Sequence, residues 1–583
     1  MTRPATAPTT DQVTVRYRAT SSGTGPLTLG QDNMIRCVLR DEPAHMSKQA
    51  SWPVPAGTTV TAALTALRTL AERHAALRTV FPGSHLERQE ERAEGEFTVS
   101  LVRTAAAADL DRLADELGRR DRQRAFDLAR DFPLRLTLLL RGEQPVRLVV
   151  VVCHAQLDGA ATALLVGEWL ALAAGRPLPA PAGPTPRAVA ELERGPAGRR
   201  RAEASLRHWE RILRCDPPVV FAHDGVDRSD HQLPTLAVRS AAGARALDRA
   251  AERTGAGASA LLLAGYAALV AHLADQRTLV IAALSANRHR RALAEHIGTL
   301  AQDALLSLDT AVPDFDLLVD RTRAAALAGY WHSTFDAAQV WQLIDDTAHR
   351  RGVRYARHMV VNDLSATVPA DTAEPPRAPR AEPEFWWLPA ETIPTRLMLN
   401  IWRTRGVLEL TLHADPQLFP PAAAEGFVTA LLRLLELAAE RTVPLAELGT
   451  LTGLATVLPP GRRSRPGWRR IDGCWIDLAA VHELLAAALD CPGELDLVED
   501  RLTATLHPDD PALTPRAAHA AVLAALPQHH TAMAPHHYVL HTPDGRRSEG
   551  SGRDPAVPAD GLALRPETAD VHGVTSLPVT WDA

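Results

Sequence analysis

A histidine, an aspartate and a glycine lie close together in the segment CHAQLDGAA (153–161). His154 ends an apolar run that predicts a buried strand, and Asp158 and Gly159 precede an apolar segment that predicts a helix. A histidine at a strand end can titrate near neutrality and transfer a proton. The start of a helix offers free N–H groups to an oxyanion, and Asp158 could cap the helix or pair with an arginine. The segment is therefore the candidate site for acid–base chemistry.

Other interpretations of these residues are weaker or purely structural. A single histidine beside an apolar strand is most often a hydrogen-bonded structural residue. No second histidine or carboxylate marks a metal site here, and no GxSxG sequence supports a Ser-His-Asp hydrolase. A separate cluster of four histidines lacks acidic partners, so we predict no metal site there either: His529, His530, His536 and His537.

Composition excludes several classes of protein. The chain has 583 residues, 46% of them hydrophobic, and a net charge of −6, which argues against binding to nucleic acid or a membrane surface. Lysine and arginine total 63, but Lys48 is the only lysine. This excludes a P-loop, argues against a pyridoxal phosphate Schiff base, and leaves no kinase-type lysine. The five cysteines form no CxxC, and no signal peptide or apolar run of 18 residues occurs, so we predict a cytoplasmic protein.

The elements that must position His154 are two strands, 133–140 and 146–153, joined by a turn, and the helix 159–175. An earlier amphipathic segment, 61–81, also predicts a helix. Later strands are predicted at 278–284, 396–402 and 407–414, with helices from an N-cap at Ser259 and over 426–442. Two Pro-rich stretches, 367–384 and 458–467, predict a surface insertion and a linker.

Several motifs, taken in order, resemble the condensation domains of nonribosomal peptide synthetases. His154 to Gly159 matches their HHxxxDG signature, which the wider superfamily of carrier- and coenzyme A-dependent acyltransferases shares. The resemblance extends over about 13–445. Its further matches are PLTLGQDNM (26–34), RHAALRTVF (73–81), TLVIAALSANR (278–288), HIGTLAQDAL (296–305), GYWHSTFDAAQVWQLI (329–344) and RLMLNIWRTRGVLELTLHADPQLF (396–419).

The resemblance implies an α/β (α+β) fold of two chloramphenicol-acetyltransferase-like lobes in a V, with His154 midway along a central tunnel. It implies that His154 positions or deprotonates the attacking amine, and that Asp158 pairs with Arg288 and supports the structure. Cys153 replaces the family's first histidine; its side chain should face away from His154, which argues against a nucleophilic role. As further residues on the tunnel or acceptor side we predict Gln302, Asn362 and Asn400.

A second resemblance concerns 468–549, which is similar to the small C-terminal subdomain of adenylation enzymes. The family's catalytic lysine is matched by Arg546, and no adenylation core precedes the segment. We therefore expect a small α+β domain with a docking or stabilising role. The predicted division of the chain is a first lobe 13–175, a linker 176–204, a second lobe 205–445, the small domain 468–549 and a loose tail 550–583.

The resemblance implies a free-standing condensation enzyme. It would transfer an acyl group from a carrier-protein thioester to an amine, which is either a small molecule or carrier-bound. No bound cofactor or metal is expected, because a thioester is already activated. Its partners would be carrier proteins with a phosphopantetheine arm, not nucleic acid or a membrane. Two alternatives remain: an ester-forming or coenzyme A-dependent acyltransferase of the same superfamily, and a non-catalytic platform that recruits partner proteins.

Overall fold

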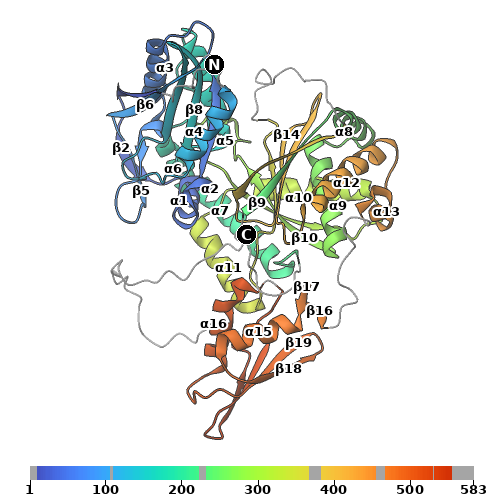
Figure 1. Cartoon of the computed structure of the whole chain (residues 1–583). Coiled ribbons are helices and arrows are strands. Elements are labelled where there is room, and N and C mark those ends of the chain that lie inside the picture. Colours follow the sequence, from blue (N-terminus) through green and yellow to red (C-terminus); the bar gives the residue numbers. More distant parts are fainter. Residues whose placement is uncertain are drawn as a thin grey trace, which may run out of the picture.

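The computed structural model describes residues 9–105, 109–221, 232–366, 382–454, 467–529 and 531–553. It contains two α/β lobes side by side and a small third domain below them (Figure 1). Within the described ranges no single helix is long and apolar enough to cross a membrane; the bent pair α8 (Ala241–Thr254) and α9 (Ala258–Ala274) meets that criterion only jointly. Most of the predicted linker 458–467, insertion 367–384 and tail 550–583 lies outside these residues.

The first lobe is built on a five-stranded sheet. Its strands, in spatial order, are β1 (Thr9–Arg18), β6 (Glu94–Thr104), β7 (Leu134–Arg141), β8 (Gln144–Cys153) and β3 (Ser47–Pro53). Alternate residues of β7 and β8 face helices α3 (Val60–Arg73) and α5 (Gly159–Ala173), and the others face α4 (Leu110–Arg122). The hairpin and the helix predicted around His154 are thereby confirmed.

Smaller elements complete this lobe. They are the three-stranded sheet of β2 (Gly23–Pro26), β5 (Arg88–Glu91) and β4 (Thr79–Val80), and the helices α1 (Leu29–Arg40) and α2 (Pro43–Met46). The helix predicted over 61–81 ends earlier, at Arg73, because the chain turns there into a 3-10 turn and β4.

The second lobe has a seven-stranded mixed sheet. Its strands, in spatial order, are β11 (Gln302–Asp309), β10 (Thr278–Ser285), β12 (Met359–Asp363), β14 (Leu397–Arg403), β15 (Leu408–Ala414), β9 (Gln232–Ser240) and β13 (Glu384–Thr392). One face is covered by α8 (Ala241–Thr254), α9 (Ala258–Ala274), α10 (Phe315–Trp331) and α12 (Pro421–Glu440). On the other face, α7 (Pro196–Cys215) and α11 (Ala337–Arg351) pack near β10 and β11.

Three details differ from the sequence-based expectations. The predicted linker 176–204 is helical from Pro186, in α6 (Pro186–Arg194) and the start of α7, because Thr185 caps a helix whose first residue is proline. Gly257, not Ser259, is the N-cap of α9; the Ser259 hydroxyl instead bonds Asp363. Strand β1 begins at Thr9, ahead of residue 13, because it pairs with β6 along its whole length.

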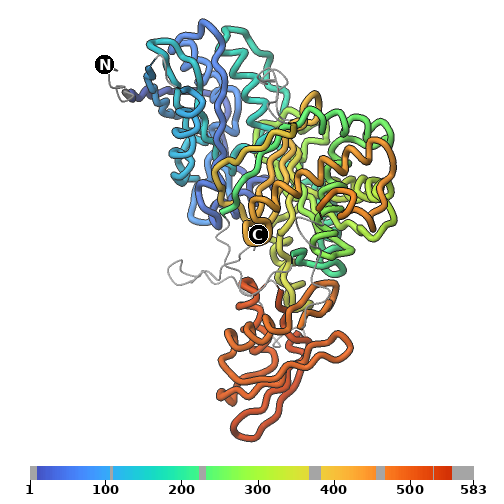
Figure 2. The backbone as a smooth tube through the Cα atoms, turned by 45° about the vertical axis from the view of Figure 1, so that its right-hand side comes forward, coloured from blue at the N-terminus to red at the C-terminus, as the bar shows by residue number. Residues whose placement is uncertain are grey.

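The small domain lies against the second lobe, at the end away from the first lobe (Figure 2). It consists of a hairpin and a four-stranded sheet with two helices: β16 (Trp468–Ile471), β17 (Cys474–Asp477), α15 (Leu478–Leu489), β18 (Gly493–Val498), β19 (Arg501–Leu506), α16 (Pro515–Ala525), β20 (His537–His541) and β21 (Arg547–Gly550). It has its own apolar core, to which Val353 of the second lobe contributes. Asp544, Gly545 and Arg546 form the turn between β20 and β21.

Candidate active site at the junction of the two lobes

Asp158 connects the two lobes. It is the N-cap of α5, where one carboxylate oxygen accepts a hydrogen bond from Ala161 N at 2.9 Å. The other oxygen accepts from the Arg288 guanidinium at 2.7 Å and from Leu300 N at 2.8 Å, both in the second lobe. Burial raises the pKa of Asp158, but the charge and hydrogen bond of Arg288 and the two backbone donors outweigh it and lower the pKa. Asp158 is therefore ionised and fixes the start of α5 against the second lobe.

Arg288 is held in place by the backbone around it. Its guanidinium also donates to the carbonyl oxygens of His296 and Gly298, at 3.1 and 2.9 Å. The preceding residue, Asn287, has a φ of 53°, in the left-handed region that asparagine adopts more readily than most residues. Its side-chain amide donates to Leu300 O at 2.9 Å. Asparagine can thus adopt this conformation, and its side chain adds a hydrogen bond that a glycine at this position would lack.

His154 lies at the end of β8, partly exposed to solvent. Burial is the main cause that lowers its pKa to about 4, and the positive charge of Lys48 lowers it further, whereas Asp158 and the histidine's own carbonyl act in the opposite direction. The imidazole is therefore neutral at pH 7, and its pKa lies well below the near-neutral value expected from its place at a strand end. Its Nδ1 is buried and has no hydrogen-bond partner among the described residues. A neutral, partly exposed imidazole can accept a proton from a substrate.

The first turn of α5 offers two free donors. Ala161 N and Thr162 N bond to Asp158, whereas Gly159 N and Ala160 N have no acceptor in the described part of the chain. Gly159 is exposed, and nothing lies within 4 Å of where its Cβ would be. Unpaired N–H groups at a helix start can stabilise an oxyanion.

Cys153 has no access to this site. It is 2% exposed and packs in an apolar cluster with Leu27, Ile35 and Phe81. Burial raises the pKa of its thiol to about 12, so it stays protonated. That Cys153 is not a nucleophile stays a prediction, which its burial supports.

The three residues predicted on the tunnel or acceptor side have different environments. Both ends of the Gln302 amide bond to the backbone of Phe335, and the residue is 2% exposed, so its side chain holds a loop and is not open to substrate. Asn362 and Asn400 are paired residues on β12 and β14. Strand alternation places both on the sheet face opposite the helices α8, α9 and α12. Their role toward a substrate stays a prediction.

That open face carries side chains that sequence reasoning missed. Trp386 on β13 and Trp402 on β14 are each 38% exposed, and Trp402 Nε1 donates to the Thr411 hydroxyl at 3.0 Å. His413 lies on β15 beside Thr235 of β9, with 2.8 Å between Nδ1 and the hydroxyl oxygen. In the sequence, only the polar residues at alternate positions of these apolar strands indicate that one face of the sheet is not covered by helices.

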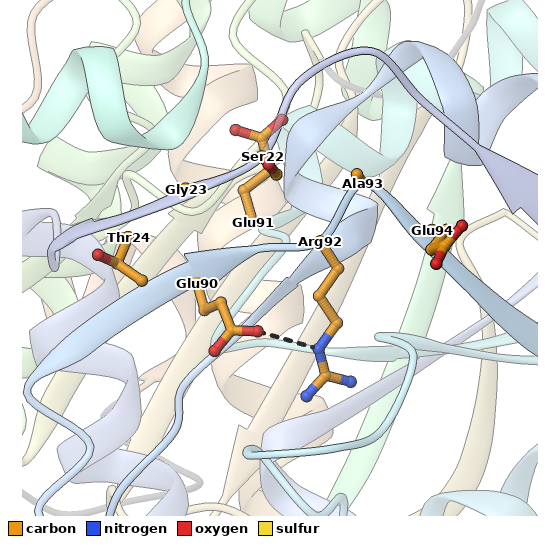
Figure 3. Close-up of a pocket in the computed structure, with 8 residues that line it drawn as sticks. All are labelled: Ser22, Gly23, Thr24, Glu90, Glu91, Arg92, Ala93 and Glu94. Atoms are coloured by element: carbon orange, nitrogen blue, oxygen red, sulfur yellow. Dashed lines mark hydrogen bonds and ion pairs between the residues drawn. The ribbon is translucent and has the colours of Figure 1, made fainter.

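A shallow depression of about 430 Å³ lies elsewhere, on the small sheet of the first lobe (Figure 3). Its lining consists of Ser22, Gly23, Thr24, Glu90, Glu91, Arg92, Ala93 and Glu94. Arg92 pairs with Glu90 across it at 3.4 Å, and Glu91 is buried against Arg78. These charges satisfy one another, and His154 is not part of the depression. In the described ranges no three His, Cys, Asp or Glu side chains are grouped to hold a metal ion; His530 lies outside those ranges.

Comparison with known families decides the identity of the fold. A model of the condensation domain matches residues 26–453. The chain belongs to the condensation-domain family. It is 30% identical over 356 residues to phosphinothricin tripeptide synthetase PhsC of Streptomyces viridochromogenes, and 28% identical over 397 residues to the probable non-canonical nonribosomal peptide synthetase CymA of Salinispora arenicola. These matches cover 56% and 64% of this chain but only 32% and 5% of those synthetases.

Solved structures share the condensation-domain fold. The first condensation domain of the calcium-dependent antibiotic synthetase matches with a TM-score of 0.58 and 19% identity, over 73% of this chain and 98% of that one. The X-domain from teicoplanin biosynthesis matches with a TM-score of 0.57 and 23% identity, over 74% and 98%. The two-lobed, chloramphenicol-acetyltransferase-like fold and the relation to peptide synthetases are thereby confirmed. The tunnel and the adenylation-like resemblance of the small domain stay predictions.

Proposed function

We propose that this condensation domain transfers an acyl group from a carrier-protein thioester to an amine. The observation that carries the proposal is a neutral, partly exposed His154 followed by a helix start with free N–H donors at Gly159 and Ala160. A base and oxyanion donors are the two groups that aminolysis of a thioester requires. The thioester is already activated, so the proposed step needs no further cofactor.

In the proposed reaction the amine nitrogen attacks the thioester carbonyl carbon and forms the amide C–N bond. The carbonyl oxygen becomes an oxyanion near the N–H groups of Gly159 and Ala160. His154 takes the proton that the amine loses. The C–S bond then breaks, the oxyanion returns to a carbonyl, and the leaving phosphopantetheine thiolate takes the proton from His154. Asp158 and Arg288 keep the start of α5 in place.

The experiment is intact-mass analysis of an acyl-loaded carrier protein incubated with this protein and a panel of amines. We expect loss of the acyl group only when protein and amine are both present. His154→Ala should abolish that loss with an unchanged circular dichroism spectrum, because it removes the proposed base. His482→Ala, an exposed histidine of α15, is the matched control and should leave turnover unchanged. Turnover by His154→Ala at the wild-type rate would contradict the mechanism.

A second candidate is a platform that recruits partner proteins. It is favoured by the fold shared with the X-domain from teicoplanin biosynthesis, which has also been solved in complex with OxyB. Exposed Trp386 and Leu388, which share one face of edge strand β13, offer an apolar surface. The same mass experiment separates the two functions: a platform would leave every loaded carrier intact with every amine.

A further inference from the structure

Lys48, the only lysine in the chain, lies beside the proposed base. It is the second residue of β3, an edge strand, and its Cα partner across the strand pair is Val152 of β8. His154 comes two residues after Val152. Neighbouring strands lie about 4.8 Å apart, so Lys48 and His154 belong to the same end of the sheet. The chain uses arginine at its other 62 Lys/Arg positions, so a lysine beside the proposed base is unusual for this sequence.

The edge of the second lobe's sheet meets the first lobe at this point. Just before Lys48, His45 Nδ1 donates to the Thr392 carbonyl oxygen on β13, with a distance of 2.7 Å. Arg122 of the first lobe pairs with Glu391 on β13 at 3.2 Å. Lys48 is nevertheless exposed to solvent. It therefore lies close to the contact between the two lobes with its side chain accessible to solvent.

The positive charge of Lys48 is not neutralised by the protein. Its Nζ donates one hydrogen bond, to His45 O at 2.8 Å, and forms no ion pair within the described ranges. The two nearby carboxylates are already engaged: Glu391 with Arg122, and Asp41 with Arg40. An ammonium has three donors, so two remain for a ligand.

The histidines around Lys48 are uncharged, so they neither neutralise its ammonium group nor compete with it for an anion. Burial, and the Lys48 charge, lower the pKa values of His154 and His413 to about 4, and that of His45 well below its ordinary value. All three are neutral at pH 7. An accessible and uncompensated ammonium among neutral side chains suits an anionic group of the substrate.

We propose that Lys48 binds a free carboxylate of the acceptor, so that the acceptor is an untethered amino acid or a similar small amine with a carboxylate. This inference rests on the proposed amide-forming function. An acceptor loaded on a carrier protein has its carboxyl group consumed in the thioester and offers no charge to Lys48. The residue thus selects between the free and tethered acceptors that the sequence leaves open.

The kinetic test compares an accepted amino acid with its primary amide, using wild type, Lys48→Met and Lys48→Arg. We expect Lys48→Met to raise KM for the free amino acid about 10- to 150-fold, the range for a charged hydrogen bond, with little change for the amide. Lys48→Arg should recover most of the loss. Arg18→Met, which removes an exposed surface charge, is the control. Equal KM values for wild type and Lys48→Met would overturn the inference but leave amide formation intact.

A binding test does not depend on turnover. Reductive ¹³C-methylation labels one lysine and the α-amino group, so the spectrum contains a single lysine signal that keeps its positive charge. An equimolar mixture of amino acids should shift this signal, and the matching amides should not. A shift with inorganic phosphate or 4′-phosphopantetheine but not with the amino acids would assign the anion to the carrier arm and overturn the inference. If no acyl transfer occurs with any amine, the proposed function fails even where the signal shifts.

Discussion

At the scale of single residues, the charge state of His154 sets the pH range of the reaction. The neutral imidazole is the base, so activity is present above its pKa in the folded protein and is lost as pH falls through that value. Because burial and Lys48 hold this pKa at about 4, well below the ordinary 6.5, we expect the acid limb of kcat/KM near pH 4. The measurement needs an acceptor amine that titrates below this limb, and circular dichroism to show that the protein stays folded.

Lys48→Met provides the comparison for this pH profile. Removal of a positive charge near His154 makes its protonated form less unfavourable, so the pKa should rise and the acid limb should move to higher pH. Arg18→Met should leave the limb in place. A limb at pH 6.5 in all three proteins would show that His154 is not desolvated in the way the structure describes.

At the scale of elements, the junction between α5 and the second lobe depends on a buried ion pair. Asp158→Asn keeps a residue that can cap α5 but removes the partner of Arg288, whose side chain is 9% exposed. Loss of one partner of a buried pair typically costs about 3–5 kcal/mol, so we expect a decrease of that size in the free energy of unfolding in urea. Asp109→Asn, at the exposed N-cap of α4 and without an ion pair in the described ranges, should change it little. Equal unfolding midpoints for the two variants would show that the Asp158–Arg288 pair does not stabilise the fold more than an exposed N-cap does.

The elements around His154 could be predicted because their signals are local. The Val-rich strand, the turn at 142 and the Asp-capped helix all lie within about 40 consecutive residues, so short sequence patterns are enough to predict them. Helices α6 and α7 were missed because prolines at 176–187 suggest a linker, whereas Pro186 and Pro196 are first residues of helices. The position of Lys48 could not be predicted, because it depends on β13, which lies more than 330 residues later and approaches only in the folded chain.

At the scale of the whole molecule, the small domain is held to the second lobe by side chains that reach across the boundary between them. Arg351, a residue of α11 that is 8% exposed, is fixed within the second lobe because its guanidinium donates to the carbonyl oxygens of Leu213 and Asp216 at 2.7 and 2.5 Å. The same guanidinium crosses the boundary and bonds the exposed Asp472 carboxylate of the small domain at 2.7 Å. On the other side of the contact, Trp475 Nε1 donates to Asp275 O at 3.2 Å. This arrangement is that of a docked domain and not of one that swings freely.

Arg351→Met tests that attachment. It removes the charged hydrogen bond to the exposed Asp472 carboxylate, which is worth about 1.5 kcal/mol or more. Hydrogen exchange of the backbone amides in the hairpin β16–β17 should then quicken by about tenfold or more, while β7 and β8 keep their protection, because no described residue of the first lobe bonds Arg351. Arg323→Met, an exposed arginine of α10, is the control. Equal acyl transfer by Arg351→Met and wild type would show that the small domain is attached for a purpose other than catalysis, whereas a parallel loss of transfer would show that the lobes need it in place.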